Sequence, residues 1–274
     1  MTTLNKIFVV IDPTTDNQTA LANVAKIVSQ STQVSLHVYE AIYSTRDNAD
    51  PDALQRVVLD RHRAWVESLV KPIRAAGNEV TVEIEWTSKW RDAIAPAAEK
   101  SGADLIVKTA SVHGGAGRRL LKTSDWTLLR NSHCPVYLIK KDVIEDGVKV
   151  LVALDIARDD ELHSILNEKV LEYGRVFVGS FPDSSLHAVN AYPSSETFIH
   201  QCDLAATTGI ERTYAHTVEG APEKVIPEIA EQIDAGIVVI GTAARHGYGA
   251  VVIGNTVEKI LDSLDANILT VKAA

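Results

Sequence analysis

Short apolar runs alternate with longer amphipathic stretches along the whole of this chain. Each run is a few residues long and bounded by turn-forming residues, which is typical of buried parallel strands. In the stretches between them, apolar residues recur every three to four positions, as in helices that bury one face. The pattern predicts strands at 6–11, 34–39, 80–85, 104–108, 135–139, 149–154, 175–179, 211–216, 236–241 and 268–272, and helices at about 17–30, 52–76, 91–101, 120–131, 159–173, 195–207, 221–235 and 255–265.

The second half of the chain repeats the first. The segment Lys6–Asp12 (KIFVVID) resembles Lys149–Asp155 (KVLVALD), and Ala103–Val107 resembles Ala235–Val239. The last predicted strand of each half ends in a lysine, Lys140 or Lys272. These collinear matches predict two domains, 1–141 and 148–274, joined by a short polar linker.

Strands separated by helices imply right-handed crossovers and a buried parallel sheet. The predicted fold class is therefore α/β, with two tandem, doubly wound, five-stranded parallel-sheet domains. In such sheets, ligands bind beyond the carboxyl ends of the strands, where the strand order reverses. The loops that follow the strands are the places to look for a site.

Composition narrows the functional classes. The chain has 274 residues, of which 46% are hydrophobic, and 27 basic against 36 acidic residues give a net charge of −9. This balance argues against direct nucleic-acid binding, which depends on Lys and Arg. No apolar run approaches the roughly 18–20 residues of a membrane span, and no secretory signal is evident. Two cysteines cannot form a disulfide framework or a four-thiolate zinc site. We expect a cytoplasmic protein with no membrane partner.

The charge is divided unevenly between the halves. Residues 1–141 hold 18 basic and 15 acidic residues, whereas residues 142–274 hold 9 and 21. Two interpretations remain open: drift on solvated faces, or different ligands or partners for the two halves.

A loop with several glycines follows the strand predicted at 236–241 and leads into the last helix. Glycine lets backbone amides approach an anion closely, and the helix start at Asn255 and Thr256 supplies free N–H groups. Arg245 lies in this loop and could pair with charge. The loop is neither a P-loop nor a dinucleotide fingerprint. It is either an anion site or a turn-rich connection with a capped helix.

This loop resembles the signature of the universal stress protein family: Gly, two residues, Gly, nine residues, Gly, then Ser or Thr. In that family the signature holds the ribose and phosphates of ATP. Gly241 and Gly254 match the first and third glycines. Ala244 stands at the second, and Asn255 stands at the Ser/Thr position. A methyl group at 244 puts the phosphate contact in doubt, because positive φ would be costly there.

The resemblance covers essentially the whole chain and implies the strand order 3-2-1-4-5 in each domain. It assigns the adenine-contacting aspartate to Asp155 and the backbone contact at the end of strand two to about Val178. The implied nucleotide site comprises Asp155, Val178, Gly241, Ala244, Arg245, Gly254, Asn255, Thr256 and Val257.

The resemblance also implies a function. We expect a non-catalytic, ligand-binding regulatory stress-response protein that binds ATP or another nucleotide in its second half, with Mg²⁺ as a candidate companion of the nucleotide. The two halves are expected to pair through their last strands, as an intramolecular pseudo-dimer. Two alternatives stay open: a weak ATPase or phosphotransfer enzyme, for which Asp155 is thin support, and an interaction module without a small ligand.

The first half departs from the signature. Thr109, Val112 and Lys122 fall at its three glycine positions, although Asp12 still matches the aspartate and Val38 the strand-two position. The remaining residues make a locally basic mouth, which either takes an anion through side chains or is a solvated loop; they are Lys108, His113, Gly114, Gly115, Gly117, Arg118, Arg119 and Lys122.

Two tryptophans follow the third strand of the first half. Trp86 and Trp90 are interpreted either as part of the core or as the lining of an apolar pocket.

Overall fold

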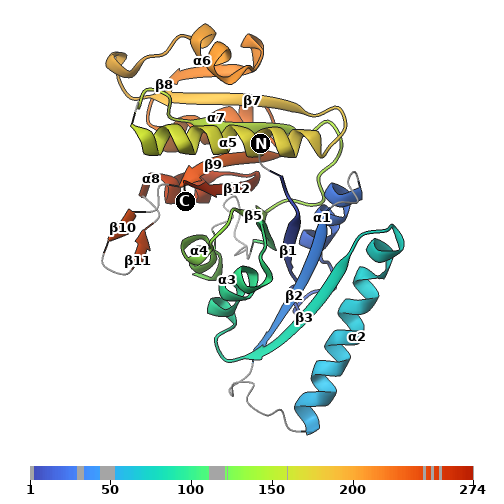
Figure 1. Cartoon of the computed structure of the whole chain (residues 1–274). Coiled ribbons are helices and arrows are strands. Elements are labelled where there is room, and N and C mark those ends of the chain that lie inside the picture. The colour runs from blue at the N-terminus through green and yellow to red at the C-terminus, as the bar shows by residue number, and fades with distance from the viewer. Residues whose placement is uncertain are drawn as a thin grey trace.

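The computed structural model describes residues 3–29, 34–43, 53–110, 121, 123–158, 160–242, 245–247, 250–252 and 255–273. Strands and helices alternate through both halves (Figure 1). The first half contains β1 (Lys6–Val10), α1 (Thr19–Ser29), β2 (Ser35–Tyr43), α2 (Ala53–Ala75), β3 (Val80–Thr87), α3 (Trp90–Ser101), β4 (Leu105–Thr109), α4 (Thr123–Asn131) and β5 (Val136–Ile139).

The second half repeats the alternation and adds a small hairpin. It contains β6 (Lys149–Leu154), α5 (Glu161–Gly179), β7 (Ser185–Tyr192), η1 (Ser195–Thr197), α6 (Gln201–Thr208), η2 (Arg212–Tyr214), β8 (Ala215–Glu219), α7 (Pro222–Gln232), β9 (Ile237–Thr242), β10 (Arg245–Gly247), β11 (Ala250–Val252), α8 (Asn255–Ser263) and β12 (Asn267–Lys272).

The main strands join in one ten-stranded sheet in the order β3-β2-β1-β4-β5-β12-β9-β6-β7-β8. Each half contributes a parallel unit in the order 3-2-1-4-5, and the second unit continues the sheet from the first with its strands in the reverse order. This confirms the predicted α/β fold. The units meet where β5 pairs with β12 in the antiparallel sense, with Leu138 opposite Ile268.

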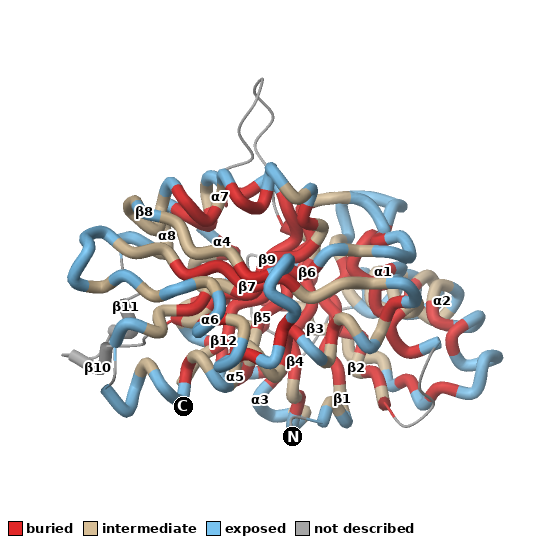
Figure 2. The backbone as a smooth tube through the Cα atoms, turned by 90° about the horizontal axis from the view of Figure 1, so that it is seen from above, coloured by how far each residue is buried: buried red, intermediate tan, exposed pale blue. Residues whose placement is uncertain are grey.

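The sheet has a separate hydrophobic core on each face, and alternate residues of each strand point into one core or the other. Along β1, Ile7 and Val9 enter one core and Phe8 and Val10 enter the other, because successive side chains of a strand point to opposite faces. Helices α1, α2, α5 and α6 supply residues to the first core, and α3, α4, α7 and α8 to the second. Both cores draw on both halves, and buried strands run through the middle of the molecule (Figure 2).

Two lysines tie the halves together reciprocally. The Lys140 ammonium, after β5, donates to the carbonyls of Leu261 and Leu264 at the end of α8, at 2.6 and 2.9 Å. The Lys272 ammonium, at the end of β12, donates to the carbonyls of Arg130 and Ser132 at the end of α4, at 3.1 and 2.6 Å. Each half thus places a cation on the C-terminus of a helix in the other, where unpaired carbonyls favour it.

The strand expected at 175–179 is wrong, because these residues form the last turns of α5. Val170, Tyr173 and Phe177 are spaced as one face of a helix and are buried in one core. Phe177 packs against Tyr137 of β5 with ring centroids 4.8 Å apart. The true second strand is β7, and the single helix expected at 195–207 is instead η1 followed by α6.

Candidate functional site

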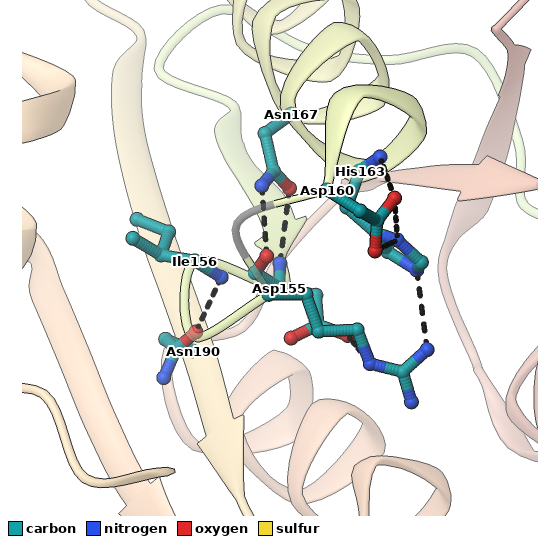
Figure 3. A network of polar contacts seen from close by, with 7 residues as sticks. Asp155, Ile156, Asp160, His163, Asn167 and Asn190 are labelled. Atoms are coloured by element: carbon teal, nitrogen blue, oxygen red, sulfur yellow. Dashed lines mark hydrogen bonds and ion pairs between the residues drawn. The ribbon is translucent and has the colours of Figure 1, made fainter.

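Asp155 lies at the carboxyl end of β6, and its backbone is held on both sides (Figure 3). The Asn167 amide oxygen accepts from Asp155 N at 3.0 Å, and the Asn167 amide nitrogen donates to Asp155 O at 2.8 Å. The next residue, Ile156, donates its N–H to the Asn190 side-chain oxygen of β7 at 3.1 Å. These hydrogen bonds fix the backbone of Asp155 and so the position of its Cα atom, from which the carboxylate extends.

The Asp155 carboxylate itself is 46% exposed and lies 3.2 Å from Arg158 Nε. Arg158 also contacts His163, 3.3 Å from its Nε2. Asp160 caps α5 by accepting from His163 N at 3.1 Å, and the hydrogen bond from the His163 ring lowers the Asp160 pKa. The site therefore offers an accessible carboxylate beside a guanidinium.

The sheet brings the loop after β9 to the same edge as Asp155. β6 and β9 are parallel neighbours, so their carboxyl ends meet at that edge. Asn255 and Thr256 open α8 and are exposed, while Val257 is half-buried and packs against a core. Ala244 and Gly254 lie outside the described residues.

Arg245 has a different local structure from the loop that was expected, whereas Gly241 lies in a strand as predicted. Arg245 begins β10, which pairs with β11 in register Arg245 to Val252, so it belongs to a hairpin. Gly241 lies inside β9, where an added Cβ would meet Leu166 Cδ2 at 3.3 Å. Its lack of a side chain is explained by close packing under α5.

Val178 is not part of this edge, because it lies in α5 rather than at the end of a strand. By strand register the position equivalent to Val38 is Ala188 of β7. Two residues further along β7, opposite Leu154 and beside Asp155, lies Asn190. It is fully buried, and its side-chain nitrogen has no hydrogen-bond partner among the described residues. The sequence signal was available, in a polar residue near the end of an alternating strand, but the apolar run at 175–179 obscured it.

The equivalent edge of the first half, at the carboxyl ends of its own strands, holds a cavity of about 650 Å³, within the usual range of small-molecule sites. Asp12 lies on it and is clamped like Asp155: Gln18 Oε1 accepts from Asp12 N at 3.0 Å, and Gln18 Nε2 donates to Asp12 O at 2.8 Å. The lining is Val10, Ile11, Asp12, Pro13, Thr14, Ala41, Tyr43, Trp90, Arg91, Ile94, Lys108, Thr109, Leu121, Thr123 and Ser124.

Lys108 was expected in a basic mouth that is solvated or takes an anion, but it is buried and ion-paired. Its ammonium lies 2.7 Å from the Asp125 carboxylate and donates to Thr109 O at 2.9 Å. Residues 111–120 and Lys122, the rest of that mouth, lie outside the described residues. Trp90 lines the cavity, as one interpretation of the sequence held, and Ser124 and Leu121 were missed.

The described ranges contain neither a candidate membrane helix nor a candidate metal cluster. None of their helices combines the length and apolar character that crossing a bilayer requires. No three or more His, Cys, Asp or Glu side chains there are grouped so that they could hold a metal ion.

Known proteins resemble the chain along its whole length. The model of the universal stress protein family matches residues 3–140 and 181–272. Universal stress protein E of Escherichia coli K12 is 29% identical over 99% of this chain and 95% of its own length, and that of Photorhabdus laumondii is 27% identical over 99% and 96%.

Solved structures resemble it as well. A Pseudomonas aeruginosa UCBPP-PA14 structure superposes with a TM-score of 0.83 at 28% identity, covering 98% of this chain and 93% of its own. A universal stress protein from Archaeoglobus fulgidus shares the fold, with a TM-score of 0.77 at 20% identity over 98% and 99% of the two chains.

Proposed function

This chain belongs to the universal stress protein family, a family of stress-response proteins, and we propose that it is a non-catalytic regulatory member that binds an adenine nucleotide in its second half. The proposed ligand is ATP or a related nucleotide, with Mg²⁺ accompanying the phosphates. The proposed place of action is the cytoplasm.

One observation carries the proposal: the fixed backbone and accessible carboxylate of Asp155 at the edge shared with the start of α8. A carboxylate at this point can accept hydrogen bonds from a base or ribose. The N-terminus of α8, with Asn255 and Thr256 exposed, offers N–H donors and a positive dipole end to phosphate. The buried side-chain nitrogen of Asn190, which finds no hydrogen-bond partner in the described part of the chain, adds a donor beside the same loop.

The test is a titration with the fluorescent nucleotide mant-ATP. We expect Asp155→Ala to weaken binding by about tenfold or more, since losing a hydrogen bond to a charged group typically costs about 1.5–3 kcal/mol. The matched control is Asp12→Ala, which removes the equivalent carboxylate from the first half and should leave mant-ATP affinity unchanged. Gly254→Arg should abolish binding by placing a large side chain at the start of α8.

Equal affinity in the wild type, Asp155→Ala and Gly254→Arg would overturn the second-half site. Phosphate release separates the binding protein from a weak ATPase. We expect no multiple turnover when excess ATP and Mg²⁺ are incubated with the protein. Sustained release that Asp155→Ala abolishes would establish the hydrolytic alternative instead.

A further inference from the structure

We propose that the first-half cavity is a second ligand site, built for a predominantly apolar, ring-bearing molecule with one hydrogen-bond-accepting end. This inference goes beyond the nucleotide proposal and does not depend on it. It rests on the cavity wall, the paired charge at its floor and a buried hydroxyl on its lining to which no described residue offers a hydrogen bond.

The wall of the cavity is largely apolar. Val10, Ala41 and Ile94 line it between β1, β2 and α3. Aromatic side chains stand at its opening: Tyr43 is 63% exposed, and the Arg91 guanidinium lies 5.2 Å from the centroid of the Trp90 ring. Aromatic rings favour stacked or edge-on contact with other rings, so the cavity suits a ring system.

The charge at the floor of the cavity is already neutralised. Lys108 is paired with the fully buried Asp125 at 2.7 Å. A polyanion such as a triphosphate would have to compete with this carboxylate for the ammonium, and separating a buried pair is strongly unfavourable. The floor therefore suits a ligand with little charge.

Ser124 supplies the polar contact. It lines the cavity in the first turn of α4 and is 2% exposed, and its hydroxyl has no hydrogen-bond partner among the described residues. Buried hydroxyls are normally paired, and the first turn of a helix also leaves N–H donors without intrahelical partners. A carbonyl, carboxylate or sulfonate oxygen at this point would satisfy both.

The second half lacks the features that shape this floor. The positions equivalent to Lys108 and Asp125, found from the strand register and the repeat, are Ile240 and Val257. Two halves of one fold thus carry different chemistry at corresponding points, as expected if they take different ligands.

Two dyes with the same ring system test the proposal on the intact protein. 1-Anilinonaphthalene-8-sulfonate carries an acceptor group, and N-phenyl-1-naphthylamine lacks it. We expect the sulfonate to bind with one-to-one stoichiometry and to resist displacement by excess ATP. Ala41→Phe, which fills part of the cavity, should weaken both dyes by about tenfold or more.

The matched control is Ala191→Phe, at the equivalent position of β7 in the second half. It should leave both dye affinities within about twofold of the wild type, whereas mant-ATP affinity should be unchanged in Ala41→Phe. Failure of the dye site and failure of the nucleotide site are therefore separate results.

Ser124→Ala tests the polar contact without filling space. It removes a hydroxyl that no described residue hydrogen-bonds, so folding should be retained. We expect a loss of about three- to tenfold in affinity for the sulfonate and no change for the uncharged dye. Displacement of dye by ATP, unchanged dye binding in Ala41→Phe, or equal effects of Ser124→Ala on both dyes would overturn the proposal.

Discussion

Gly174 shows how one missing side chain sets the distance between a helix and the sheet. A Cβ added there would lie 2.4 Å from Val152 Cγ1 and 3.0 Å from Leu186 Cδ1. Gly241 makes a similar approach from the strand side, against Leu166 and Val170 of α5. The spacing of Gly241 was noticed in the sequence as a ligand signal, but its packing reason could not be read there, because it depends on a helix about 70 residues away.

We expect Gly174→Ala to lower the free energy of unfolding by about 1–3 kcal/mol, since overpacking against β6 outweighs the better helix propensity of alanine. Gly179→Ala, in the same helix with nothing within 4 Å of its Cβ position, should leave stability unchanged or slightly raise it. Urea denaturation of both variants measures the difference. Equal effects would show that α5 can move away from the sheet without cost.

At the scale of elements, alternation and periodicity predicted most strands and helices, because buried parallel strands read as apolar runs. The elements that were predicted wrongly have identifiable physical causes. The segment 175–179 looked like a strand because Val176, Phe177 and Val178 form an apolar run rich in β-branched residues, while β7 was missed because His187 and Asn190 interrupt it. The β10–β11 hairpin was expected as a loop, and the cavity of the first half depends on side chains from elements that the sequence does not place together.

The outer strands β7 and β8 carry a histidine pair, of which His187 is buried and His216 half-buried, that should make the protein sensitive to acid. Nδ1 of His187 lies 3.4 Å from Nε2 of His216. Burial, with repulsion from His216, lowers the His187 pKa to about 4, and burial also lowers that of His216.

Because the unfolded chain binds protons near the ordinary histidine pKa of about 6.5, stability should be full above that pH. It should fall as the pH drops towards 4, with a slope of at most about 1.4 kcal/mol per pH unit for one proton. His187→Gln should flatten the slope in urea denaturation between pH 7 and 4.5. A slope unaffected by this variant would assign the acid sensitivity elsewhere.

At the scale of the whole molecule, the halves share one sheet and two cores rather than touching as separate bodies. Lys140 is buried, and its ammonium donates hydrogen bonds to carbonyls at the end of α8 in the other half. The repeat predicted two similar units and the lysine that ends each of them. The repeat could not predict that each lysine binds the end of a helix in the other half, because that contact arises only from the pairing of β5 with β12.

We expect one cooperative unfolding transition. All four tryptophans lie in the first half, so their fluorescence reports that half, whereas far-UV circular dichroism reports the whole chain. The two denaturation curves should coincide. Lys140→Met should shift both together and lower the free energy of unfolding by about 1–3 kcal/mol, because buried carbonyls lose a charged donor. Separate midpoints for the two signals would contradict a shared core.

The antiparallel pairing of β5 with β12 determines from where ligands reach the two proposed sites. All strands within a half are parallel. The antiparallel pairing therefore places the carboxyl ends of the first-half strands at one edge of the sheet and those of the second-half strands at the opposite edge. Ligands bound at the two edges would therefore not contact each other or block each other's binding. Coupling between the two sites would have to pass through the shared core, in which Tyr137 of the first half packs against Phe177 of the second.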